Sequence, residues 1–148
     1  LHLVATAGEG QDLTAVFTVT ENHQGAPGLA HGGLLTLAFD EALGKLMWLM
    51  RAPAVTARLE TDFFLPVPIG SILHIKARIT GVANRKVYSE AEGHLNSFDG
   101  PLAVRASSLW VIVTMQHFLD NAPKEYIDHV KKHPELLAFV DPSFEIAP

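Results

Sequence analysis

The chain has 148 residues, of which 48% are hydrophobic and 18% charged, and its formal net charge is −5. This composition is typical of a globular protein, and the length suits one core better than two, so we expect a single domain over residues 1–148. Lys and Arg are scattered rather than clustered, which argues against nucleic acid or an anionic membrane surface as a partner. Cysteine is absent, which excludes disulfides and thiolate chemistry and makes the cytoplasm the default location.

The first predicted element is a strand, and a long loop follows it. Over residues 12–20, apolar side chains alternate with Asp and Thr, which is the period of a strand with one buried face. Residues 21–33 are rich in Gly, Pro and Asn, which predicts that no helix or strand forms before residue 34. We therefore expect an ordered loop that ends where a helix begins.

A long apolar helix follows this loop, from Leu34 to Met50. Apolar side chains occur at nearly every angle around it, so we expect neighbours on all sides and a place at the centre of the core. At about 17 residues the segment lies at the lower limit for a membrane span, and its charged residues favour a buried helix instead. Glu41 and Lys45 have the spacing of an intrahelical ion pair, whereas Asp40 has no basic residue three or four positions away.

One narrow stripe of this helix consists of small or polar residues. They recur at intervals of three or four residues and are Gly33, Thr36, Asp40 and Gly44. Because the stripe lacks bulky side chains, we expect it to face a ligand or another stretch of backbone.

Four strand-like runs follow, at residues 54–64, 71–82, 86–95 and 102–113. Their connectors are too short for parallel crossovers, so we expect them to pair antiparallel and, with the first strand, to form a five-stranded sheet around the helix. In the first run, strict alternation places Thr56 on the opposite face from Leu59. From Gln116 onward the pattern predicts a short tail of one or two amphipathic helices, broken at Pro134.

This order of elements resembles the hotdog fold, an α+β architecture in which an antiparallel sheet wraps one long helix. The loop sequence Gln-Gly-Ala-Pro-Gly-Leu-Ala-His-Gly-Gly, residues 24–33, is similar to the loop of hotdog acyl-CoA thioesterases. Within that family it is most similar to the branch that contains the mammalian carboxyl-terminal modulator protein, and the phenylacetate-pathway thioesterases are more distant relatives. The resemblance covers a core of residues 12–113 and leaves residues 116–148 as a helical extension.

Further spacings agree with this branch. They are Asp40 nine residues after His31, Thr56-Ala57 sixteen residues after Asp40, the Pro66-x-Pro68 break, and Arg85-Lys86 before a strand. Each feature is common alone, but together they are specific. One position departs from the pattern: where the branch has a basic residue before the proline break, this chain has Phe64-Leu65, so some ligand contacts differ.

The resemblance implies a site for thioester hydrolysis. It makes Asp40 either the general base that activates water or the nucleophile that forms an anhydride. Gly32 and Gly33 lie where the helix begins, so we expect their N–H groups to be unpaired and to stabilise an oxyanion. His31 would orient the loop or bind the thioester carbonyl, and Thr56 would hold the attacking water or the carboxylate.

Four other residues are candidate ligand contacts. Arg85 and Lys86 would bind the phosphates of coenzyme A, and a solvated turn explains them equally well. By resemblance, Asp62 and His74 would line the ligand groove. Purely structural alternatives also stand for the site itself: an aspartate satisfied by nearby hydroxyls, glycines required by the turn, a structural histidine and an ordinary strand threonine.

The sequence thus predicts an acyl-CoA thioesterase that releases coenzyme A and a fatty or related carboxylic acid. The alternatives are a non-catalytic acyl-CoA-binding module and a thioesterase that acts on acyl-carrier-protein thioesters. Metal-ligand spacings and nucleotide-binding fingerprints are absent, so we expect no metal and no cofactor beyond the coenzyme A of the substrate. The resemblance also implies a homodimer or a homotetramer.

Overall fold

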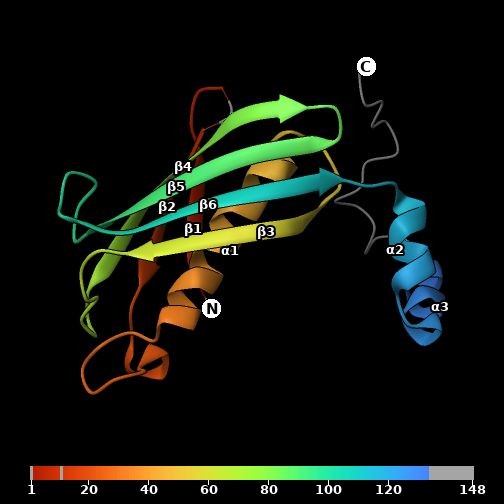
Figure 1. Ribbon diagram of the computed structural model, residues 1–148. Coiled ribbons are helices and arrows are strands. Elements are labelled where there is room, and N and C mark those ends of the chain that lie inside the picture. Colours follow the sequence, from red (N-terminus) through yellow and green to blue (C-terminus); the bar gives the residue numbers. More distant parts are fainter. Residues whose placement is uncertain (1, 11, 134–148) are drawn as a thin grey trace.

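The structure is a computed structural model that describes residues 2–10 and 12–133. Figure 1 shows a six-stranded sheet, in the order β1-β2-β4-β5-β6-β3, with helix α1 across one face. The strands are β1 (Leu3–Ala7), β2 (Asp12–Thr18), β3 (Ala54–Phe63), β4 (Ile72–Ala83), β5 (Lys86–Leu95) and β6 (Leu102–Ile112). The helices are the 3₁₀ turn η1 (Glu21–His23), α1 (Gly32–Leu49), α2 (Met115–Asn121) and α3 (Lys124–Lys132). All strand pairs are antiparallel, so the predicted α+β architecture is confirmed.

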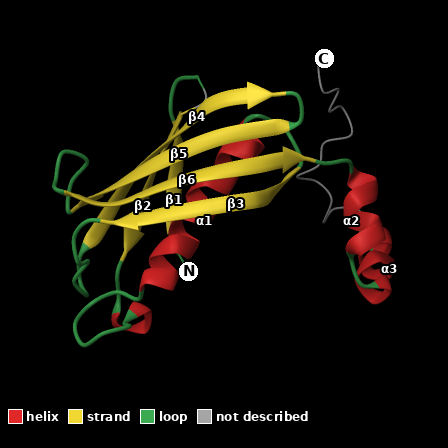
Figure 2. Ribbon diagram, viewed as in Figure 1, coloured by secondary structure: helices red, strands yellow, loops and turns green. Residues whose placement is uncertain are grey.

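Figure 2 shows that α1 crosses one face of the sheet. The core lies between this face and the helix. From α1 the buried side chains are Leu35, Ala38, Phe39, Ala42, Leu43, Leu46 and Met47, at the spacing of one helical face. From the strands they include Phe17, Leu73, Ile75, Val87, Val104 and Trp110. The closest fit is at Gly93 on β5, where an added Cβ would lie only 2.7 Å from Phe39 Cζ. The helix can therefore approach the sheet because this position has no side chain.

One side of α1 lies outside this core. The side chains of Leu37 and Trp48 are 47% and 66% exposed. The prediction of neighbours on all sides is therefore wrong within the part of the chain that the structure describes. Large exposed apolar side chains of this kind are typical of a surface that another protein surface or a ligand covers.

The charged residues of α1 behave as predicted. Lys45 Nζ lies 2.9 Å from Glu41 Oε1, so the expected ion pair is confirmed. Within residues 2–10 and 12–133, no helix is both long enough and apolar enough to span a membrane. The cytoplasmic location stays a prediction.

Four details differ from the sequence prediction. The segment 21–33, predicted to lack regular structure, contains the 3₁₀ turn η1 over its first three residues. Residues 3–7 add the edge strand β1 to the five predicted strands, and this run is too short for its alternation to be recognised. Helix α1 begins at Gly32 rather than after Gly33, because His31 caps it. The tail breaks at Pro123, between α2 and α3, whereas the predicted break at Pro134 lies outside the described residues.

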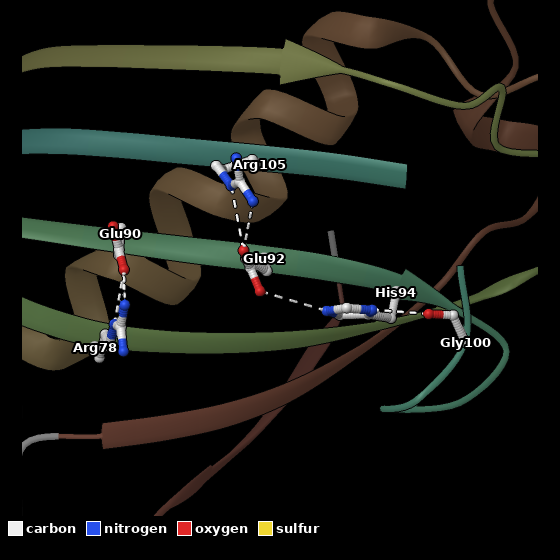
Figure 3. Close-up of polar contacts among 6 residues, drawn as sticks. All are labelled: Arg78, Glu90, Glu92, His94, Gly100 and Arg105. Atoms are coloured by element: carbon white, nitrogen blue, oxygen red, sulfur yellow. Dashed lines mark hydrogen bonds and ion pairs between the residues drawn. The ribbon is translucent and has the colours of Figure 1, made fainter. Parts of the chain in front are cut away.

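The sheet face opposite α1 carries a ladder of charged side chains across β4, β5 and β6, shown in Figure 3. Arg78 pairs with Glu90, and Arg105 Nη2 lies 2.8 Å from Glu92 Oε1. His94 Nε2 lies 3.7 Å from Glu92 Oε2. The hydrogen bond from Arg105 is the main cause that lowers the pKa of Glu92 below its ordinary value, and the nearby charges act in the same direction. The two faces of the sheet therefore differ: one is apolar and covered by α1, and the other is charged.

Candidate active site

The loop that precedes α1 is held in place around His31. The His31 N–H donates to the carbonyl oxygen of His23 at 2.7 Å, which ties the loop to η1. The ring of His31 caps the helix, because its Nδ1 accepts a hydrogen bond from the Gly33 N–H at 2.9 Å. Gly25 lies against this residue so closely that an added Cβ would be 2.8 Å from His31 Cα. The glycine at position 25 is thus required by close packing of the loop.

This cap decides which backbone donors are free at the start of α1. The Gly33 N–H is bonded to His31, so the prediction that both glycine N–H groups are unpaired is wrong for Gly33. The Gly32 N–H makes no hydrogen bond among the described residues. Because Nδ1 of His31 accepts a hydrogen bond, the neutral ring carries its proton on Nε2. The available donors at this helix end are therefore the Gly32 N–H and the His31 Nε2–H.

Asp40 and Thr56 meet across the gap between α1 and β3. Thr56 Oγ1 donates a hydrogen bond to Asp40 Oδ1 at 3.2 Å. Asp40 is half-buried on the helix, and Thr56 is exposed on the strand. This contact gives Asp40 the partner that its own helix does not supply.

A β-bulge turns Thr56 toward the helix. Thr56 is opposite the buried Trp110 of β6, whereas Arg58 is opposite Leu109, so Ala57 is an extra residue in β3. The extra residue shifts the alternation, and Thr56 lies on the same side of the sheet as Leu59. The prediction that Thr56 and Leu59 occupy opposite faces is wrong for this reason.

Asp40 and Thr56 lie in one open hollow of about 340 Å³. Its lining residues are Gly33, Thr36, Leu37, Asp40, Thr56 and Leu59. The first three members of the predicted stripe of small and polar residues line this hollow, and that they face a ligand stays a prediction. Gly44 faces the sheet instead, where an added Cβ would lie 3.4 Å from Trp110 Cη2. Leu37 and Leu59 supply the apolar part of the hollow. The sequence offers Leu37 as one of the helix residues that could set the depth of an acyl pocket, but it does not single out Leu59.

The four predicted ligand contacts lie outside this hollow. Arg85 and Lys86 are exposed on the turn between β4 and β5. Lys86 is opposite Val111 of β6, which in turn is opposite Val55 of β3, so this turn is at the same end of the sheet as Thr56. Only β6 lies between β5 and β3, so two ordinary strand spacings separate the backbones of Lys86 and Val55 by roughly 10 Å.

Asp62 and His74 lie on the face of the sheet opposite α1. Asp62 is opposite Arg105 on β6, and the His74 ring packs against Phe98 with centroids 4.7 Å apart. The structure therefore does not bring these two residues to Asp40. Over residues 2–10 and 12–133, no group of three or more His, Asp or Glu side chains is arranged to hold a metal ion.

Comparisons with known proteins show that this chain is similar to thioesterases. Residues 27–97 match the family model of the thioesterase superfamily. The acyl-coenzyme A thioesterase THEM4 of Xenopus laevis is 26% identical over 88 residues, which are 60% of this chain and 39% of that protein. A putative esterase of Pseudomonas aeruginosa, PA0474, is 31% identical over 87 residues, or 57% of this chain and 65% of that protein. The chain thus spans less than two thirds of the length of either relative.

A solved structure extends the similarity to the fold. A hypothetical thioesterase protein of Streptococcus pneumoniae, solved with coenzyme A, superposes with a TM-score of 0.70 at 14% identity. The superposition covers 76% of this chain and 89% of that one. The resemblance to hotdog-fold thioesterases that the sequence predicted is confirmed, with six strands in place of five.

Proposed function

We propose that this chain, a hotdog-fold protein of the thioesterase superfamily, is an acyl-CoA thioesterase with Asp40 as its reacting carboxylate. The observation that carries the proposal is the pairing of Asp40 with Thr56 in a hollow that the first turn of α1 also lines. A carboxylate, a hydroxyl and a helix N-terminus beside an apolar wall are the groups that thioester hydrolysis requires. The name of the frog relative, at low identity, favours coenzyme A as the leaving group.

The hydrogen bond from Thr56 orients the carboxylate for its task. Thr56 occupies Oδ1 of Asp40 and leaves Oδ2 without a hydrogen-bond partner among the described residues. As a general base, Asp40 takes a proton from water while the water oxygen bonds to the thioester carbon. The tetrahedral intermediate then collapses, the C–S bond breaks, and the coenzyme A thiolate leaves and takes up a proton. As a nucleophile, Oδ2 of Asp40 would instead attack the thioester carbon, and the C–S bond would break with release of the coenzyme A thiolate. Water would then hydrolyse the resulting anhydride to the free acid and Asp40.

The start of α1 supplies donors for the oxyanion. The Gly32 N–H makes no hydrogen bond among the described residues, and the helix dipole favours negative charge at this end. We assign the carbonyl oxygen of the substrate to this N–H, with the His31 Nε2–H as a second donor. Gly33 acts through the cap, because its own N–H holds the His31 ring in place.

The apolar side of the hollow is open, which favours a dimer. Leu37 is 47% exposed and Phe63 is 51% exposed. Phe63 lies on β3, an edge strand of the sheet, and its ring is beside Gly32, where an added Cβ would be 3.4 Å away. We propose that β3 of a second copy pairs with this edge and closes the hollow over the acyl group, giving a homodimer. Two such dimers would form a homotetramer.

The turn with Arg85 and Lys86 is the proposed contact for the phosphates of coenzyme A. Both side chains are exposed, and the turn is at the Thr56 end of the sheet. Asp62 and His74 have no part in the proposal, because they lie on the other face.

The proposal is tested by thiol release from a panel of short, long and aromatic acyl-CoAs. We expect turnover by the unaltered protein and a loss of at least about a hundredfold in Asp40→Asn, the scale of a lost general base. Glu41→Gln is the matched control, since this neighbouring carboxylate pairs with Lys45 and should leave turnover unchanged. Tight acyl-CoA binding without turnover would contradict the proposal and favour a binding module. If only acyl-carrier-protein thioesters are hydrolysed, the leaving group is the carrier-protein thiol and not coenzyme A.

A further inference from the structure

Three polar side chains are buried in the apolar core beside the candidate active site. Ser89, Ser108 and Trp110 are 2%, 6% and 5% exposed. The two serine hydroxyl oxygens lie 2.6 Å apart. Trp110 Nε1–H donates to both of them, at 2.7 Å to Ser108 and 3.1 Å to Ser89. We call these three residues the serine–tryptophan cluster.

Stability alone does not account for this cluster. Burying polar groups costs free energy unless every donor finds an acceptor. Here two hydroxyls and one indole offer three hydrogens, but only one hydroxyl can donate within the Ser89–Ser108 pair. The other hydroxyl hydrogen has no acceptor among the described residues. An incompletely satisfied cluster stabilises poorly, so its clearest effect is to fix the orientation of the indole ring.

The fixed indole lies next to both elements that carry the Asp40–Thr56 pair. On the sheet, Trp110 is directly opposite Thr56. On the helix, Gly44 lies one turn after Asp40, and a Cβ added there would lie 3.4 Å from Trp110 Cη2. The far edge of the ring thus faces α1 at Gly44, while the strand that carries the ring pairs with β3.

We propose that Ser89, Ser108 and Trp110 are positioning residues that set the separation of α1 from β3 and thereby the Asp40–Thr56 hydrogen bond of 3.2 Å. The catalytic consequence rests on the proposed function. None of the three lines the hollow, so they act on the reaction through Asp40 and Thr56 and not through the substrate. A displacement of about 1 Å in a catalytic group costs about a hundredfold in rate. Loss of the anchor should therefore lower kcat and leave KM nearly unchanged.

The first experiment replaces both serines, as Ser89→Ala with Ser108→Ala, and measures kcat and KM with an acyl-CoA. We expect kcat to fall at least about tenfold with KM within about twofold, and the circular dichroism spectrum to stay that of the unaltered protein. Ser71→Ala is the matched control, because Ser71 is buried at 7% exposure but lies outside the cluster. If the double variant does not fold, the single variant Ser108→Ala removes the nearer acceptor of the indole N–H and keeps the whole indole ring. An unchanged kcat in the folded variant would overturn the proposal.

The second experiment tests whether the cluster acts through Thr56. Thr56→Val is made in the unaltered protein and in the double serine variant, and both kcat and the urea midpoint of unfolding are measured. We expect the two changes to be non-additive, because each disturbs the same Asp40–Thr56 contact. Additive effects on both quantities would overturn the proposal. If the unaltered protein shows no turnover that depends on Asp40, the proposed function fails, and the urea midpoints still decide whether the cluster and Thr56 are coupled.

Discussion

At the scale of single residues, the site depends on the direction of one threonine. The sequence indicates that Asp40 needs a partner outside its own helix, and it singles out Thr56 through the resemblance. The resemblance implies that Thr56 holds the attacking water or the carboxylate, whereas strict alternation turns Thr56 away from Leu59 and from the helix side of the sheet. The extra residue Ala57 reverses that alternation, and nothing in the run Thr-Ala-Arg at residues 56–58 signals a bulge.

Removing the Thr56 hydroxyl should slow catalysis with little effect on the fold. Thr56→Val keeps the branched shape that a strand favours and loses only the donor to Asp40 Oδ1. Hydrogen bonds to charged groups contribute about 1.5–3 kcal/mol, so we expect kcat for acyl-CoA hydrolysis to fall about tenfold to a hundredfold. Thr56→Ser keeps the hydroxyl and should retain most of the activity in the same thiol-release assay. Equal rates for the Val and Ser variants would contradict this role.

At the scale of elements, the sequence predicts α1 well but not what lies against each side of it. Its ion pair is confirmed, and the predicted segment from Leu34 to Met50 corresponds to the helix Gly32–Leu49. Three members of the small stripe line the hollow. Periodicity cannot show which apolar side chains stay uncovered, because apolar residues occur all around this helix. It also cannot show that Gly44 leaves the stripe and faces Trp110, since that depends on how the helix crosses the sheet.

Two glycines between the helix and the sheet should respond in opposite ways to alanine. At Gly44 an added Cβ would be 3.4 Å from Trp110 Cη2, which is ordinary contact, and alanine favours a helix over glycine by about 1 kcal/mol. At Gly93 the added Cβ would be 2.7 Å from Phe39 Cζ, and overpacking a core costs about 1–3 kcal/mol. Urea unfolding should therefore show Gly44→Ala more stable than the unaltered protein and Gly93→Ala less stable. A destabilised Gly44→Ala would mean that the indole lies closer to α1 than described.

At the scale of the whole molecule, the two faces of the sheet have different roles. The face under α1 carries the core, the serine–tryptophan cluster and Thr56, whereas the other face carries the charged ladder of β4, β5 and β6. Alternation along each strand predicts this division away from the register shifts, which occur in β3, between β4 and β5, and between β5 and β6. The candidate ligand residues Asp62 and His74 were chosen by resemblance, and the register places both on the charged face. Plain alternation already predicts this face for both, because Asp62 alternates with Phe63 and His74 alternates with Leu73.

The charged ladder should make the stability of the whole domain depend on pH in the acid range. The pKa of Glu92 lies below its ordinary value of 4.5 in the folded protein, chiefly because Arg105 donates a hydrogen bond to it. The contribution of Glu92 to folding is therefore complete above the unfolded pKa and is lost as pH falls through the folded pKa. The Glu92 side chain is 41% exposed, so solvent screening limits this contribution to about 1 kcal/mol or less.

Between pH 7 and pH 3, the free energy of unfolding in urea should fall less in Glu92→Gln than in the unaltered protein. Glu9→Gln, on the exposed loop after β1, is the control and should keep the unaltered slope. Equal slopes for the unaltered protein and Glu92→Gln would show that the ladder adds nothing to folding.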